Sequence, residues 1–197
     1  MNLPNKLTVF RIALVPVCVF VWLFPYSSFH IAIPVFQIGH VSISLINLIV
    51  LLIFSTASFT DMLDGKIARG RNLVTTFGKF ADPIADKILV NTMLVIMANK
   101  GILPVVPVVI MLCRDTVVDG CRMLAASNGV VIAAGNLGKM KTVLQMITII
   151  LALLNNLPFE LINLPVSELM TWVCAFVSAA GGYTYFSQVK DFIFESM

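Results

Sequence analysis

Charged residues are scarce in this sequence. They make up 12% of its 197 residues, and hydrophobic residues make up 59%. Ordinary soluble domains contain about twice that share of charged residues, so the composition excludes an ordinary soluble domain. The mean hydropathy of +0.98 and the repeated long apolar runs instead predict a helical protein that crosses a membrane several times.

Three further absences narrow the possibilities. No linker or low-complexity tract interrupts the chain, so we expect one domain over residues 1–197. No small-residue cleavage site follows the first apolar run, which therefore predicts a retained helix rather than a removed signal peptide. The four cysteines form no Cys-x-x-Cys pair, so a redox or metal motif is not expected, and we interpret them as small core residues.

Apolar segments along the chain predict an all-α, polytopic membrane protein with six transmembrane helices. The predicted spans are residues 7–24, 41–60, 80–98, 102–122, 142–157 and 169–186. Of the 13 Lys and Arg residues, all except Lys100 fall at the span ends that share one face. The positive-inside rule assigns this face, and with it both termini, to the cytoplasmic side of the cell membrane. Such a face suits anionic lipid headgroups, and nucleic acid is not an expected partner because the basic residues lie at span ends.

The fourth predicted span is unusual. Its uninterrupted apolar run, residues 102–113, is too short to cross a bilayer. A crossing helix would have to carry Arg114, Asp115 and Asp119 to membrane depth, where charged side chains normally face a bundle interior or a watered cavity. The alternative is that Arg114 and Arg122 extend to the cytoplasmic interface.

Four aspartates lie close together in the sequence between positions 61 and 86. Counted from Asp61, the spacing is three residues to Asp64, four to Gly65 and seven to Ala68, so on a helix these residues share one face. Two carboxylates on that face stand beside two residues with almost no side chain. Such a surface lets a bulky ligand approach the backbone next to a bound metal.

The next segment repeats the pattern, with Gly78, Asp82 and Asp86 at intervals of four residues. Three or four converging carboxylates suit Mg²⁺ or Mn²⁺ rather than zinc. Arg69, beside the carboxylates, has the planar fork that binds a phosphate oxygen. The two segments therefore predict a divalent-metal site for a phosphorylated substrate.

The start of this second helix has its own signals. Thr75 or Thr76 is a suitable N-cap. Pro83 is compatible with the helix if it lies in the first turn.

The pattern Asp61-x-x-Asp64-Gly65-x-x-Ala68-Arg69, followed after eight residues by Gly78, Asp82 and Asp86, resembles the signature of the CDP-alcohol phosphatidyltransferase family at every position. Chain length and six predicted spans also resemble that family. Shorter similarities lie at residues 4–8 with Arg11, at 82–87, at 114–115 and at 138–142.

This resemblance implies a metal-dependent enzyme that transfers a phosphatidyl group from a CDP-lipid to an alcohol and releases CMP. It implies that Asp61, Asp64, Asp82 and Asp86 hold Mg²⁺ or Mn²⁺. Asp86 would also accept the proton of the acceptor hydroxyl. The residues implied for the CDP-lipid pocket are Asn5, Thr8, Gly65, Ala68, Arg69, Thr75 and Gly78. Members of the family are commonly homodimers, which is the implied assembly here.

The family signature does not specify the acceptor, whereas we expect the donor to be CDP-diacylglycerol. The candidate cations for an acceptor phosphate are Arg114, Arg122, Lys139 and Lys141, although each could equally serve topology and lipid anchoring. This basic group favours a phosphorylated acceptor, and we expect glycerol 3-phosphate. Inositol phosphate, serine and phosphatidylglycerol stay open as alternatives.

Two other classes of protein are compatible with an aspartate cluster in an apolar chain. Intramembrane prenyltransferases also hold a magnesium diphosphate, but their two clusters lie far apart in longer chains. A small cation transporter would place its carboxylates near mid-membrane rather than at one end. Both are therefore less favoured than a phosphatidyltransferase.

A Gly181-Gly182 pair interrupts the last predicted span. It could mark close helix packing, a kink or a notch that faces lipid. The sequence does not choose among these.

Overall fold

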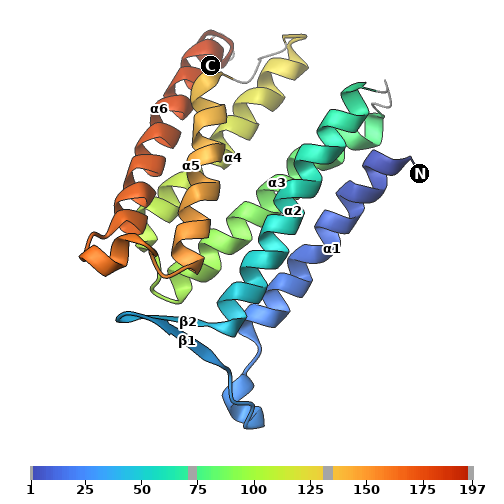
Figure 1. The fold of residues 1–197 in the computed structure, drawn as a ribbon. Coiled ribbons are helices and arrows are strands. Elements are labelled where there is room, and N and C mark those ends of the chain that lie inside the picture. Colours follow the sequence, from blue (N-terminus) through green and yellow to red (C-terminus); the bar gives the residue numbers. More distant parts are fainter. Residues whose placement is uncertain (1, 71–74, 131–134, 195–197) are drawn as a thin grey trace. The chain divides into compact units, whose positions relative to one another are not determined.

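The computed structural model describes residues 2–70, 75–130 and 135–194, and for residues 62–70, 79 and 191–194 it describes the backbone without the side chains. This part of the chain is mostly helical (Figure 1). Its α-helices are α1 (Leu3–Leu23), α2 (Leu45–Gly70), α3 (Thr76–Asn99), α4 (Val105–Ser127), α5 (Asn136–Leu153) and α6 (Val166–Phe194). Its shorter elements are the 3-10 helices η1 (Tyr26–Phe29) and η2 (Phe159–Ile162) and the strands β1 (Val35–Ile38) and β2 (Val41–Ser44).

Each of the six predicted spans overlaps one of these α-helices, so the helical prediction is confirmed. An all-α fold is wrong in one detail, because β1 and β2 form an antiparallel hairpin in which Val35 pairs with Ser44 and Ile38 with Val41. The predicted second span began inside β2. That strand buries Val41 and Ile43 and exposes Ser42 between them, which is the period-two alternation of a strand rather than a helix.

The helices belong to two compact units. The first contains Met1–Met93 and Leu153–Leu164, and the second contains Leu94–Ala152 and Pro165–Met197. In the first unit α1 packs along α2 (Figure 1). In the second unit α4 packs along α6. The single domain expected from the sequence stays a prediction.

Buried apolar residues at helical spacing form the packing surfaces within each unit. In the first unit α1 buries Val15, Cys18 and Trp22, which lie three and four residues apart. The second unit contains a buried group of Cys121, Ala125 and Val189. The core role predicted for the cysteines is confirmed for Cys18, Cys121 and Cys174, whereas Cys113 is exposed on α4.

Large apolar side chains are also exposed on every α-helix. Examples are Phe20 on α1, Leu52 on α2, Phe80 on α3, Val109 on α4, Ile147 on α5 and Phe176 on α6. Among the described helices, α1 and α5 are both long and apolar enough to cross a membrane, and Leu45–Asp61 is a shorter apolar segment. Six membrane crossings and the side on which the termini lie stay predictions.

At the start of α3 the predicted threonine cap is present, but Pro83 does not lie in the first turn. Thr75 Oγ1 accepts a hydrogen bond of 3.0 Å from the Gly78 N–H, as an N-cap residue does. Because this cap starts the helix at Thr76, Pro83 lies inside α3 rather than in its first turn. Pro83 has no N–H, so α3 lacks one of its internal hydrogen bonds next to the aspartates.

Candidate active site

One face of α1 carries three buried polar side chains. Asn5, Thr8 and Arg11 are three residues apart, so each lies about one helical turn from the next. Their exposed fractions are 9%, 1% and 0%. Buried polar groups are costly unless they are hydrogen-bonded, and each of these three contacts a residue in or next to α2 or α3.

Arg11 joins two of the predicted metal ligands. Its Nη1 lies 2.7 Å from Asp61 Oδ1 on α2 and 2.7 Å from Asp86 Oδ1 on α3. The arginine side chain is fully buried, whereas the Asp61 and Asp86 side chains are 31% and 41% exposed. Hydrogen bonds between ionised groups are short and strong, so this contact holds two carboxylates of separate helices close together. Both carboxylates still have a surface that a ligand can reach.

Thr8 and Asn5 extend the same arrangement along α1. The Thr8 hydroxyl donates a 2.6 Å hydrogen bond to Asp82 Oδ1. Asn5 Oδ1 accepts a 2.9 Å hydrogen bond from the Thr75 hydroxyl, the group that caps α3. The polar face of α1 therefore orients Asp82 directly and supports the start of the helix that carries it.

Gly78 lies inside this cluster, where the space for a side chain is small. A Cβ at this position would lie 3.3 Å from Thr75 Oγ1, 3.4 Å from Asn5 Oδ1 and 3.6 Å from Asp82 Oδ2. Of the residues predicted for the CDP-lipid pocket, the structure thus brings Asn5, Thr8, Thr75 and Gly78 together with the aspartates.

The remaining signature residues are Asp64, Gly65, Ala68 and Arg69, and their side chains lie outside the described part of the chain. The backbone of α2 is helical from Leu45 to Gly70. The spacing of three, four and seven residues from Asp61 therefore places Asp64, Gly65 and Ala68 on one helical face with it, as the sequence predicts.

The donor set of the cluster fits a hard divalent cation. Asp61, Asp82 and Asp86 offer carboxylate oxygens, the ligands that Mg²⁺ and Mn²⁺ prefer, and two of these oxygens already converge on a cationic nitrogen. Among the side chains that the structure describes, no group of three or more His, Cys, Asp and Glu residues is placed to hold a metal ion. Asp64 is outside that comparison, so the four-aspartate metal site stays a prediction.

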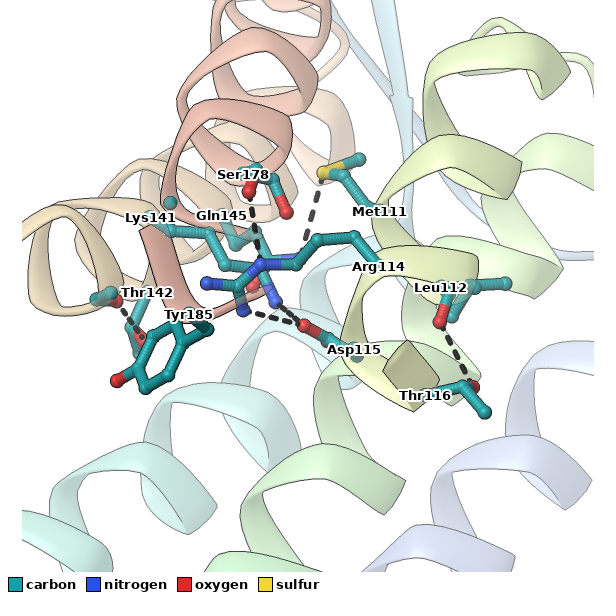
Figure 2. Close-up of polar contacts among 12 residues, drawn as sticks. Met111, Leu112, Arg114, Asp115, Thr116, Lys141, Thr142, Gln145, Ser178 and Tyr185 are labelled. Atoms are coloured by element: carbon teal, nitrogen blue, oxygen red, sulfur yellow. Dashed lines mark hydrogen bonds and ion pairs between the residues drawn. The ribbon is translucent and has the colours of Figure 1, made fainter. Parts of the chain in front are cut away.

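A second polar cluster occupies the other unit and centres on Asp115 of α4 (Figure 2). Its Oδ1 accepts hydrogen bonds from Lys141 Nζ on α5 and, at 3.1 Å, from Arg114 Nη1. Asp115 and Lys141 are each 6% exposed. Arg114 Nε also donates to the Ser178 carbonyl of α6 at 2.9 Å. Arg114 therefore faces the interior of its unit, which agrees with the bundle-interior interpretation rather than with extension to an interface.

Tyr185 of α6 lies between two arginines of α4. Its hydroxyl oxygen accepts hydrogen bonds from Arg122 Nη2 at 2.9 Å and from the Gly135 N–H at 3.2 Å. The guanidinium carbons of Arg122 and Arg114 lie 5.1 and 5.8 Å from the ring centroid, within the range of cation–π attraction. Tyr185 is 3% exposed, so it is a buried support for both cations.

The structure decides among the alternatives for the Gly181-Gly182 pair. A Cβ on Gly182 would lie 2.8 Å from Arg114 Cγ, and one on Gly181 would lie 3.1 Å from Arg114 Nη2. The pair therefore marks close packing, in which the missing side chains leave room for the arginine.

This packing leads to a testable expectation. Gly182→Ala should displace the Arg114 side chain, because the methyl group meets the stem of that side chain rather than its mobile end. Overpacking of this kind typically lowers the free energy of unfolding by about 1–3 kcal/mol. Thermal unfolding of the purified protein measures the loss. Gly120→Ala on α4 is the matched control, since nothing lies within 4 Å of its Cβ and alanine favours a helix. Equal stability of the two variants would contradict the packing role.

The structure brings three of the four predicted acceptor-binding cations into this second cluster, either directly or through Tyr185. They are Arg114, Arg122 and Lys141. Lys139 is exposed near the start of α5. Whether these cations bind an acceptor phosphate stays a prediction.

Sequence reasoning did not assign site roles to Arg11, Asp115 and Tyr185. A signal existed for Arg11, which follows Thr8 at helical spacing on a very apolar segment, where a buried charge needs a partner. Asp115 had a similar signal, because the apolar run of the fourth predicted span is too short to cross a bilayer unless the span includes this charged residue. Tyr185 had none, because its contacts come from residues 50 and 63 positions away.

Ionisable residues on apolar helices mark functional sites by default, and this chain carries an aspartate cluster on two such helices and a buried Lys141 on another. The chain belongs to the CDP-alcohol phosphatidyltransferase family, whose sequence model matches residues 1–180.

Three relatives show how far this similarity extends. A Bacillus subtilis (strain 168) protein named CDP-diacylglycerol–glycerol-3-phosphate 3-phosphatidyltransferase is 42% identical over 95% of this chain and 94% of its own length. A Rickettsia bellii protein of the same name is 36% identical, with 97% of each chain covered. A third protein of that name, from Pseudomonas fluorescens, is 29% identical over 96% of this chain and 88% of its own.

Proposed function

We propose that this protein transfers the phosphatidyl group of CDP-diacylglycerol to sn-glycerol 3-phosphate, which forms phosphatidylglycerophosphate and releases CMP. The observation that carries the proposal is the gathering of Asp61, Asp82 and Asp86 around one face of α1. It occurs in a chain whose relatives, named for this reaction, are similar over almost their whole length.

In this proposal Asp61, Asp64, Asp82 and Asp86 hold Mg²⁺ or Mn²⁺, which when bound neutralises charge on the diphosphate. Asp86 is the general base and accepts the proton of the acceptor hydroxyl. The hydroxyl oxygen forms a bond to the lipid-side phosphorus while the bond from that phosphorus to CMP breaks. The 41% exposure of the Asp86 side chain supports this role, because a base must be reachable by its substrate.

The CDP-lipid lies against the small residues of the signature. Gly65, Ala68 and Gly78 allow the nucleotide diphosphate to approach the backbone, and Arg69 contacts a phosphate oxygen. Asn5, Thr8 and Thr75 complete this pocket. The position of Gly78 beside Asp82 supports the assignment.

The acceptor phosphate binds to the cations of the second unit. Arg114, Arg122, Lys139 and Lys141 are the proposed ligands, and a dianionic phosphate needs several such donors. Asp115 accepts hydrogen bonds from both Arg114 and Lys141, which supports a site built from several elements rather than scattered surface charge.

We place the protein in the cell membrane, with six membrane crossings and with both termini and the aspartate cluster on the cytoplasmic side. The exposed apolar side chains on all six α-helices support a lipid environment, since soluble proteins rarely expose large apolar patches. The homodimer implied by the family resemblance is part of this proposal.

Purified protein supplied with CDP-diacylglycerol and Mg²⁺ or Mn²⁺ tests the reaction, with CMP measured for each acceptor in turn. We expect CMP release with glycerol 3-phosphate. Release with inositol phosphate, serine or phosphatidylglycerol in its place would reassign the acceptor. No release with any of them would overturn the proposed reaction, and prenyl diphosphate turnover or metal flux would then identify one of the other classes.

A further inference from the structure

We infer that Arg11 is a built-in counter-cation of the aspartate cluster, which holds Asp61 and Asp86 together and raises the concentration of divalent cation that the cluster requires. This role for Arg11 rests on the metal site of the proposed function.

Burial and contacts separate Arg11 from Lys6, the other basic residue of α1. Lys6 on the same helix is exposed, as a residue of a cytoplasmic, lipid-facing end should be. Arg11 is 0% exposed, and its Nη1 lies at hydrogen-bond distance from carboxylates of two other helices. The charge pattern assigns Arg11 to the basic, cytoplasmic face of the membrane. That role does not explain its position, because a residue that contacts lipid headgroups would not direct its charge into the protein.

Two carboxylates that lie this close repel each other unless a cation stands between them or one of them takes up a proton. Asp61 and Asp86 come from α2 and α3, so their repulsion would act directly on the packing of those helices. Arg11 supplies the missing charge from α1. The cluster is thus assembled before any metal ion binds, with an arginine in contact with the same oxygens that a metal ion would use.

A shared set of oxygens means that Arg11 and a divalent cation compete. The guanidinium adds one positive charge beside the carboxylates and occupies one lone-pair direction on each Oδ1 atom. Removal of that charge should therefore strengthen divalent-cation binding while it weakens the metal-free fold. A residue that served only to support the structure would have the opposite effect on binding, because a disordered cluster binds more weakly.

Arg11→Gln tests the inference, with Lys6→Gln as the matched control, since it removes a basic residue from the exposed face of the same helix. Two measurements are made on detergent-purified protein: the melting temperature in a chelator, and the affinity for Mn²⁺ from the free-Mn²⁺ signal in electron paramagnetic resonance. For Arg11→Gln we expect a melting temperature lower by about 10 °C in chelator, because a buried ion pair has lost one partner. We also expect Mn²⁺ binding about tenfold tighter, equivalent to about 1.4 kcal/mol. The Lys6→Gln variant should match the wild type in both.

A second variant separates charge from shape. Arg11→Lys keeps the positive charge but loses the planar fork, so it should bind Mn²⁺ about as weakly as the wild type while melting at a lower temperature. If Arg11→Gln folds only when Mn²⁺ is present, the counter-cation role is supported, because the metal ion then replaces the arginine. Failure to fold at any Mn²⁺ concentration, or Mn²⁺ binding equal to or weaker than the wild type, would overturn it.

The result is distinguishable from a failure of the proposed function. If the wild-type protein releases CMP but the Arg11→Gln variant binds Mn²⁺ no more tightly than the wild type, the proposed reaction stands and the proposed role of Arg11 is overturned. Wild-type protein that binds no Mn²⁺ would overturn the metal site and the inference together.

Discussion

Asp86→Asn is expected to abolish CMP release while CDP-diacylglycerol still binds. An amide cannot accept the proton of the acceptor hydroxyl, and the loss of a general base typically lowers a rate by about 10²–10⁴-fold. The amide oxygen can still accept a hydrogen bond from Arg11, which contacts Asp86 Oδ1 at 2.7 Å in the native protein, so the local packing should persist. CMP release gives the rate, and equilibrium binding of CDP-diacylglycerol gives the affinity.

Glu168→Gln is the matched control for this variant. Glu168 is an exposed carboxylate in the first turn of α6, so its neutralisation should leave turnover and melting temperature unchanged. Turnover by Asp86→Asn at the wild-type rate would remove Asp86 from the mechanism. Loss of CDP-diacylglycerol binding along with turnover would instead make Asp86 a ligand whose main role is to hold the donor.

Arg114→Ala should raise the Michaelis constant for glycerol 3-phosphate by about 10²-fold with a much smaller effect on that for CDP-diacylglycerol. Hydrogen bonds to a charged group contribute about 1.5–3 kcal/mol each, and three contacts hold Arg114 in place in the second unit. It contacts Asp115, the Ser178 carbonyl and the face of Tyr185. Steady-state kinetics with each substrate varied in turn measures the two constants.

Two further variants define what the loss of Arg114 means. Lys190→Ala removes an exposed cation of α6 and should leave both Michaelis constants unchanged. Arg114→Lys keeps the charge but not the fork that reaches Ser178, so its constant for glycerol 3-phosphate should lie between those of the wild type and Arg114→Ala. If the CDP-diacylglycerol constant rises more than the glycerol 3-phosphate constant, Arg114 belongs to the donor pocket.

Much of the fold was predictable because its signals are local. Long apolar runs located the six described α-helices, and a threonine at position 75 or 76 marked the start of α3. The signature register of α2 also followed from local spacing, since a continuous helix from Leu45 to Gly70 needs no distant contact to align Asp61 with Ala68. The hairpin was missed because four alternating residues at β2 continue directly into an apolar helix, and hydropathy averaged over a long window does not separate the two.

The candidate site was predictable in its aspartates and less so in the contacts that hold them. Asp61, Asp82 and Asp86 stand out by type and spacing alone. The role of Arg11 did not, because its partner Asp86 is 75 residues away in the chain and an arginine near a span end has an ordinary topological explanation.

By itself, the sequence determined the helical class of this protein, the family to which it belongs and the residue types of its candidate site, because apolar runs and signature spacing are properties of neighbouring residues. Only the tertiary structure decided which charges meet. It placed the guanidinium of Arg11 between two carboxylates, buried Lys141 against Asp115, and used Gly182 to make room for Arg114. Each of these contacts joins different helices, and packing between helices is what no local pattern encodes.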